Sequence, residues 1–282
     1  MGNVKFKKKI KLLIKILFIF SAFFIIINKI DINKLKEIKL IYPSFLFLAF
    51  ITFNISQIIS ALRVHNYLKN IKVTPSFKTQ LMLYYLGMFY NILLPGGIGG
   101  DAYKAYKFQK KFEVGYKKII KALLIDRFSG LFAIFVIISV LVFFSSFKVF
   151  LVYASSLLLI SPFVLYFIHK YLFFEFKKSF FKTFIFSLII QSLQLITFIL
   201  ILFAFNVKEN LIDYGILFLI SSIISVIPIS IGGVGLRELT FLYAAKYFNI
   251  NAEAGILSAF LFFIITLISS SIGILFIRSK HV

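Results

Sequence analysis

Long apolar segments separated by short polar ones dominate the pattern along the chain. An α-helix needs roughly 20 apolar residues to cross the ~30 Å hydrocarbon core of a bilayer. No polar segment is long enough to form a separate soluble domain. The pattern therefore predicts an all-α, polytopic integral membrane protein in which residues 1–282 form a single domain. The apolar segments of spanning length lie at about 10–30, 43–62, 119–145, 149–168, 183–206 and 255–277.

Two further apolar runs, at about 79–100 and 214–236, each end in a cluster of glycines. The first cluster reads PGGIGGD (95–101), and the second, about 136 residues later, reads GGVGLRE (232–238). Glycine and proline interrupt helices, so each run can either cross the membrane or enter it and turn back. Non-helical backbone at that depth is tolerated only inside protein or beside a water-filled cavity.

The positions of lysine and arginine distinguish these two alternatives, because cytoplasmic loops carry an excess of both residues. If both runs are re-entrant and the N-terminus is cytoplasmic, most of the 32 lysines and arginines fall on the cytoplasmic side, including the basic segment 101–121. If both runs cross, that segment lies outside. We therefore predict a helical bundle with six full spans, two re-entrant helix hairpins and both termini cytoplasmic. The first span follows a basic start but is too long for a signal peptide, so we expect it to be retained.

The same offset of about 136 residues relates more than the glycine clusters. It carries span 43–62 onto 183–206 and span 119–145 onto 255–277. Repeat one then covers about 1–145 and repeat two about 146–282, each with three full spans and one re-entrant element. An odd number of crossings turns the second repeat upside down, which predicts inverted repeats. Broken helices at corresponding places in such repeats mark the substrate site of many transporters.

Amide side chains follow the same offset. Asn54 and Gln57 fall within one residue of Gln191 and Gln194, so each half carries an i,i+3 amide pair on one helix face. Such amides can either line a cavity or hydrogen-bond neighbouring helices.

Composition narrows the function classes. Hydrophobic residues make up 61% of the chain, and the formal net charge is +22. In a soluble protein this charge would suggest nucleic acid, but here the lysines flank apolar spans, where they orient the protein and contact anionic headgroups at the cytoplasmic face. We therefore expect no nucleic-acid partner. The chain has no cysteine and only three histidines, which show no metal-ligand spacing, so no metal or cofactor is expected.

Charged residues near the glycine clusters are the candidate functional groups, because a charge at the centre of a membrane helix costs roughly 2.5–3.5 kcal/mol. One hypothesis is that Arg127 and Arg237 bind a lipid phosphate, while Asp101, Asp126 and Glu238 hold the arginines or take a proton. The other is a purely structural ion-pair network. The glycines likewise either present backbone N–H groups to an anionic headgroup or allow close helix packing.

The sequence suggests no functional role for Arg63 or for the three histidines. Arg63, at the cytoplasmic end of span 43–62, is expected to reach the membrane surface as ordinary snorkelling arginines do. The histidines are isolated in loop or terminal positions, and no function is assigned to them.

Three motifs, in this order and spacing, resemble the lysylphosphatidylglycerol synthase transmembrane family: LLPGGIGGDAYKAY (93–106), DRFSG (126–130) and PISIGGVGLREL (228–239). That family includes the flippase-type membrane part of the multiple peptide resistance factor. The resemblance covers nearly the whole chain. It implies a multi-pass protein of a bacterial or archaeal plasma (inner) membrane that moves an anionic lipid between leaflets, either aminoacylated or polyprenyl-linked. The substrate-binding positions that it implies are Gly96, Gly97, Gly99, Gly100, Asp101, Tyr103, Asp126, Arg127, Gly232, Gly233, Gly235, Arg237 and Glu238.

Compared with the full resistance factor, we expect this protein to lack a segment that binds aminoacyl-tRNA and transfers lysine, since the sequence runs to residue 282. We therefore expect a lipid flippase without covalent chemistry rather than an enzyme, and the word synthase would describe relatives. Two alternatives stay open. The first is a non-transporting membrane subunit that recruits a lipid-modifying or glycosyltransferase partner through its basic face. The second is a membrane-embedded transferase using the buried carboxylates, for which the sequence offers no donor site.

Overall fold

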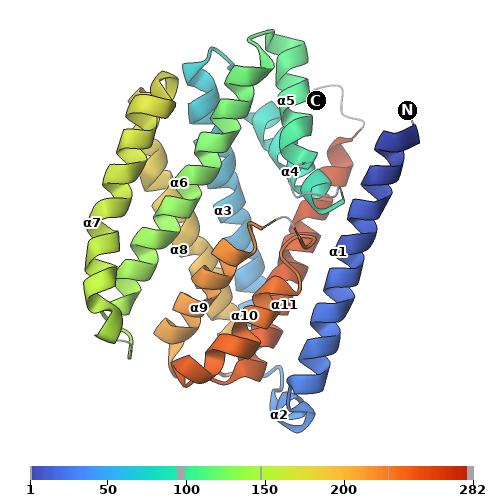
Figure 1. Cartoon of the computed structure of the whole chain (residues 1–282), viewed down its shortest axis with the longest axis vertical. Helices are drawn as coiled ribbons and strands as arrows, with labels where there is room; N and C mark the ends of the chain where they lie inside the picture. Colours follow the sequence, from blue (N-terminus) through green and yellow to red (C-terminus); the bar gives the residue numbers. More distant parts are fainter. Residues whose placement is uncertain (1, 94–98, 147, 228, 278–282) are drawn as a thin grey trace.

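The computed structural model describes residues 2–93, 99–146, 148–227 and 229–277, and within these ranges it consists of helices and short connections (Figure 1). The α-helices are α1 (Gly2–Lys29), α2 (Ile32–Glu37), α3 (Pro43–Asn70), α4 (Phe77–Leu93), α5 (Gly99–Phe112), α6 (Tyr116–Val142), α7 (Leu151–Phe167), α8 (Phe180–Ala204), α9 (Leu211–Ile224), α10 (Leu236–Ala244) and α11 (Ala252–Ser271). Shorter 3₁₀ or π turns are η1 (Lys148–Phe150), η2 (Ile168–Leu172), η3 (Phe174–Ser179), η4 (Ala245–Phe248) and η5 (Ile272–Phe276).

Helices long and apolar enough to cross a membrane confirm the class of the protein. The described residues contain 5 such spans, and each overlaps a span expected from the sequence. The remaining expected span, about 10–30, lies within α1, of which Ile16–Lys29 forms a shorter apolar helix. The protein is therefore an all-helical, multi-pass membrane protein. The candidate spans are Pro43–Asn70, Tyr116–Val142, Leu151–Leu172, Phe174–Ala204 and Ala252–Phe276.

The centre of the bundle is built on α3 and α8, which pack more extensively against each other than any other described pair of elements. On α8, the fully buried ring of Phe198 stacks on Phe218 of α9 at 4.5 Å and on Phe241 of α10 at 5.5 Å between ring centroids. Close aromatic packing of this kind adds to the dispersion contacts that hold membrane helices together. It fixes α9 and α10 on the central pair.

Two pairs of shorter helices lie at opposite ends of the molecule. The pair α4 and α5 lies in the half that contains the start of α1, whereas α9 and α10 lie in the other half (Figure 1). Within the run 79–100, the structure describes α4 up to Leu93 and α5 from Gly99, and these two helices pack against each other. Residues 94–98, including Gly96 and Gly97, lie outside the described residues.

Glycines determine the geometry of both pairs. At Gly100, an added Cβ would overlap the carbonyl oxygen of Gly87, so α5 can approach α4 closely only because this position has no side chain. Between α9 and α10, Gly232, Gly233 and Gly235 have φ values of 63°, 85° and 85°. This left-handed conformation is readily adopted by glycine alone. The second cluster therefore ends one apolar run and redirects the chain into α10.

Candidate functional site

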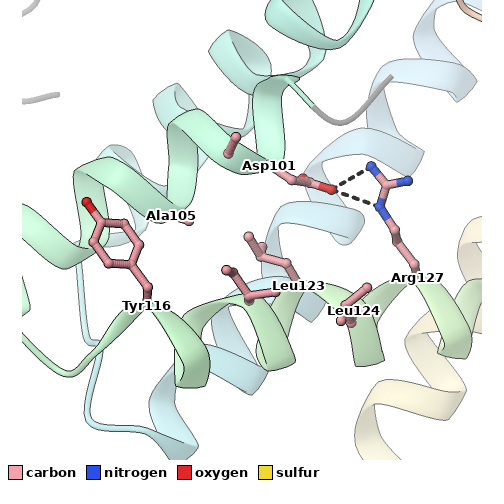
Figure 2. Close-up of a pocket in the computed structure, with 8 residues that line it drawn as sticks. Asp101, Ala105, Tyr116, Leu123, Leu124 and Arg127 are labelled. Atoms are coloured by element: carbon pink, nitrogen blue, oxygen red, sulfur yellow. Dashed lines mark hydrogen bonds and ion pairs between the residues drawn. The ribbon is translucent and has the colours of Figure 1, made fainter. Parts of the chain in front are cut away.

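The first predicted charge, Asp101, lies in the first turn of α5 and joins it to α6. Its Oδ1 is 2.6 Å from Lys104 Nζ, and its Oδ2 is 2.6 Å from Arg127 Nη2 and accepts a 2.8 Å hydrogen bond from Arg127 Nε (Figure 2). Asp101 lies outside the five candidate spans. Burial raises the pKa of its carboxyl, but Lys104 and Arg127 lower it more, so that the pKa lies below its ordinary value. One carboxylate thus contacts two positive side chains.

The start of α5 is fixed by Asn91 of α4. Its Oδ1 accepts a 2.8 Å hydrogen bond from the backbone N–H of Gly100. That N–H is therefore used within the protein, and Gly100 serves close packing rather than presenting a backbone donor to a ligand. Tyr103 faces Tyr90 of α4, with 4.7 Å between the ring centroids. Gly100 and Tyr103 thus shape the pairing of α4 with α5, and Gly99 is the first residue of α5.

Arg127 lies between two cavities of different character. One, of about 410 Å³, is an almost wholly apolar pocket between α5 and α6 with the Asp101–Arg127 ion pair at its wall (Figure 2). The other, of about 270 Å³, is more polar and lies between α4, α6, α11 and the segment after α9. The side chain of Arg127 is 42% exposed and lines both. The polar cavity is also lined by Met88, Asn91, Ile92, Ser225, Val226, Ile227, Ser230, Gly232, Gly233 and Thr266.

Arg237, at the start of α10, lines a third cavity of about 190 Å³. Its Nη1 donates a 2.7 Å hydrogen bond to Ser222, and its guanidinium carbon lies 5.4 Å from the ring centroid of Phe218 and 5.2 Å from that of Phe262. Cation–π contacts of this kind hold a cation in an apolar environment. The third cavity and the polar cavity are both lined by Met88, Gly232 and Thr266. Arg127 and Arg237 therefore border neighbouring cavities.

Glu238 does not hold Arg237 as expected. Its side chain is fully buried, and its Oε2 accepts a 2.7 Å hydrogen bond from the backbone N–H of Gly235, which caps α10. No ion pair joins Glu238 to a basic group among the described residues. The reason is geometric, because consecutive helical residues point in different directions. Gly235 faces Ala22 of α1 and does not line these cavities.

Asp126 does not hold Arg127 either, and its partner is Arg63. The Arg63 Nε and Nη2 donate to the two Asp126 oxygens at 2.7 Å and 3.2 Å, while Nη1 donates to Ser187 of α8 at 2.8 Å. Arg63 is 6% exposed, so the expectation that it snorkels is wrong. The physical reason is that α3 continues to Asn70, which places Arg63 two turns inside the helix rather than at its end.

The rest of the DRFSG motif serves the same helix junction. Gly130 packs directly beside the guanidinium, because a Cβ at this position would lie in van der Waals contact with Arg63 Nη1, at 3.4 Å. Ser129 lies 2.5 Å from the hydroxyl of Tyr67, which is also 3.1 Å from Nε2 of buried His169 in the π turn η2. The interpretation of His169 as an isolated loop residue is thus wrong. Sequence reasoning missed Arg63 and His169. For Arg63 the signal is that the helical segment continues beyond the apolar span, so that a charged residue lies inside the helix.

Of the four amide side chains singled out in the sequence, two line a cavity and two form hydrogen bonds between helices. Gln57 and Gln194 line the third cavity beside Arg237. Asn54 donates to Ser269 of α11 at 3.0 Å, and Gln191 donates to the Gly130 carbonyl at 3.4 Å, so these two connect helices. Within the part of the chain that the structure describes, no group of three or more histidine, cysteine or acidic residues could hold a metal ion.

Comparison with known families decides the classification. The family model described as lysylphosphatidylglycerol synthase TM region matches residues 12–273. The chain belongs to this family. The match confirms the resemblance carried by the three motifs and identifies a membrane protein of lipid metabolism. A search of the curated proteins found no match.

Proposed function

We propose that this protein moves an anionic lipid, aminoacylated or polyprenyl-linked, between the leaflets of the plasma membrane, without covalent chemistry. The observation that carries the proposal is the place of Arg127, which lines an apolar pocket on one side and a polar cavity on the other. A phospholipid has the same division, with a phosphate between acyl chains and a polar headgroup. In this proposal the acyl chain enters the α5–α6 pocket, the phosphate lies at Arg127 and the headgroup occupies the polar cavity.

The charges around Arg127 favour binding of an anion. Asp101 contributes one negative charge and contacts two positive ones, Lys104 and Arg127, so the cluster carries a net positive charge. Arginine presents a planar fork of donors that matches phosphate geometry. Arg237, bordering the neighbouring cavity, adds a second positive group.

The path of the chain supports the inverted-repeat topology. In the first half a long helix, α3, is followed by the short pair α4–α5 and then by α6. In the second half α8 is followed by the short pair α9–α10 and then by α11. The two short pairs lie in opposite halves of the molecule (Figure 1). We therefore propose six full spans, two re-entrant pairs and both termini in the cytoplasm, with the polar cavity where the two broken regions meet.

Cysteine accessibility tests this topology cleanly, because the chain has no cysteine of its own. Single substitutions Lys110→Cys, in the last turn of α5, and Lys208→Cys, between α8 and α9, are compared in intact cells. We expect a membrane-impermeant maleimide to label Lys208→Cys without permeabilisation and Lys110→Cys only after it. Labelling of Lys110→Cys in intact cells would place that segment outside and contradict the re-entrant arrangement.

Exposed lysines gather at the α5–α6 connection, including Lys110, Lys111, Lys117 and Lys118. In the proposed orientation this basic face contacts anionic headgroups of the cytoplasmic leaflet. A lipid-modifying or glycosyltransferase enzyme bound there is the alternative. A pure scaffold has no need of arginines that line cavities, so the positions of Arg127 and Arg237 favour transport.

Lipid retained during purification tests the binding step. We expect anionic phospholipid to co-purify with the protein in mild detergent and to be depleted several-fold in Arg127→Ala, because a charge-assisted phosphate contact is lost. Lys208→Ala, which removes an equal charge from an exposed position between α8 and α9, away from this basic face, is the matched control and should retain lipid. Quantitative mass spectrometry of the extracted lipid measures the ratio. Equal retention in all three proteins would remove Arg127 from the binding site.

A further inference from the structure

Glu238 differs from the other two acidic residues of the site in lacking a cationic partner in direct contact. Asp101 contacts Lys104 and Arg127, and Asp126 is paired with Arg63. Glu238 is fully buried, its Oε2 accepts the Gly235 N–H, and its buried Oε1 has no hydrogen-bond partner among the residues that the structure describes. The α10 cap therefore uses only half of this carboxyl group.

An ionised carboxylate has two oxygens that accept hydrogen bonds, whereas a protonated carboxyl bears its proton on one of them. Burying an oxygen of an ionised group without a partner is costly, and protonation removes most of that cost. Oε2 can keep its bond to Gly235 in either state, so Oε1 is the atom that can gain and lose a proton without dismantling the start of α10.

The neighbour that responds to this charge is Arg237. It is adjacent in sequence, it interacts electrostatically with Glu238, and it lines the third cavity. While Glu238 is ionised, its negative charge opposes an anion that approaches Arg237. Protonation of Glu238 removes this opposition. The structure thus places a buried carboxyl group directly beside an arginine that lines a cavity.

Other charged or titratable side chains occur on the elements that pack against α10, which are α1, α8, α9, α11 and η4. The charged residue of α8 is Lys182, in its first turn. Within the described side chains, Arg237 is the one whose charge acts on Glu238. The others gather toward the far end of α10 or at the starts of α9 and α11, and they are Lys29, Asp213, Tyr214, Tyr243, Lys246, Tyr247 and Glu253.

We propose that Glu238 binds a proton together with the anionic headgroup that binds beside Arg237, so that lipid movement is coupled to proton movement. The inference rests on the proposed function and adds its driving ion. The proton adds to Oε1 from the aqueous phase of one side and leaves from the same oxygen to the other side, so no bond of the lipid is broken. By thermodynamic linkage, proton binding tightens headgroup binding and headgroup binding tightens proton binding equally.

The test measures binding of 1-palmitoyl-2-oleoyl-phosphatidylglycerol to purified protein in neutral detergent between pH 6 and pH 8. Uptake of one proton per lipid changes the apparent affinity by up to about tenfold per pH unit. We expect the unaltered protein to bind at least about tenfold more tightly at pH 6 than at pH 8. Glu238→Gln, which keeps an oxygen for Gly235 but carries no charge, should bind alike at both pH values. Glu253→Gln, a buried acid at the start of α11, is the matched control and should behave like the unaltered protein.

The same proteins in liposomes of phosphatidylcholine and phosphatidylglycerol show whether coupling drives movement. A pH gradient should bias the leaflet distribution of labelled phosphatidylglycerol with the unaltered protein and with Glu253→Gln, but not with Glu238→Gln. If lipid binding and lipid movement by the unaltered protein did not depend on pH, the proton site would be contradicted, but the proposed function would not. An absence of binding and movement at every pH, with the protein folded, would overturn the proposed function itself. If Glu238→Gln fails to fold, the pH dependence of binding by the unaltered protein still tests the proton site.

Discussion

Asp126→Asn is expected to lower stability strongly, because it leaves the buried guanidinium of Arg63 without its carboxylate. The two side chains are 8% and 14% exposed, and the contact is bidentate. Removing one partner of a buried ion pair costs roughly 3–5 kcal/mol, which corresponds to a fall in Tm on the order of 10 °C. Thermal stability in detergent, followed by size-exclusion chromatography after heating, measures the loss. Glu175→Gln, which removes an exposed acid, is the control and should leave Tm unchanged.

The pair as a whole is expected to be replaceable. In Arg63→Met with Asp126→Leu, both charges disappear together, and uncharged side chains in place of a buried ion pair are often neutral or stabilising. The double variant should therefore recover most of the lost Tm. If Asp126→Asn alone were as stable as the unaltered protein, Arg63 and Asp126 would not form the buried junction of α3 and α6 described above.

Arg127→Ala is expected to abolish most lipid movement without unfolding the protein. Asp101 keeps Lys104 as a partner when Arg127 is removed, so no buried carboxylate is left alone. A hydrogen bond to a charged group contributes about 1.5–3 kcal/mol, so the rate should fall about tenfold to a hundredfold. Arg127→Lys should be intermediate, because lysine replaces a planar fork by a point charge. Lys208→Ala, at an exposed position away from the basic face, should transport normally.

If Arg127 instead stabilises the fold through its ion pair with Asp101, the expected results differ. Arg127→Ala would then lose thermal stability and activity together, and neutralising its partner with Asp101→Asn would restore both. Measuring Tm and lipid movement on the same purified variants distinguishes the two readings. Rescue of both properties by the second substitution would withdraw Arg127 from substrate binding.

The arrangement of elements could be predicted from the sequence because it depends on segment length. Apolar runs near 20 residues predicted the spans. The glycine clusters indicated that 79–100 and 214–236 are interrupted, but α9 already ends at Ile224, before the cluster that begins at Gly232. Gly232, Gly233 and Gly235 have positive φ, which is a local property that the residue type itself indicates. Gly100 is different, because its neighbour Gly87 on α4 is identified only by the packed structure.

The ion pairs could not be predicted in the same way. Asp126 and Arg127 are adjacent in sequence, as are Arg237 and Glu238, yet the ion pairs of the described residues join other partners. On a helix, consecutive residues project about 100° apart, so Asp126 faces Arg63 of α3 while Arg127 faces Asp101 of α5. Partners separated by many positions depend on which helices pack together, and the apolar pattern does not specify that.

Leaflet-resolved movement of lipid by the unaltered protein tests the central claim most directly. Liposomes of phosphatidylcholine and phosphatidylglycerol, containing a trace of fluorescent phosphatidylglycerol, are prepared with and without protein, and a membrane-impermeant reductant is added outside. We predict that nearly all the fluorescence disappears from vesicles that contain the protein, whereas protein-free vesicles lose only the outer-leaflet share. If vesicles with folded, inserted protein lost only the outer-leaflet share as well, the proposal that this chain moves anionic lipid between leaflets would be contradicted.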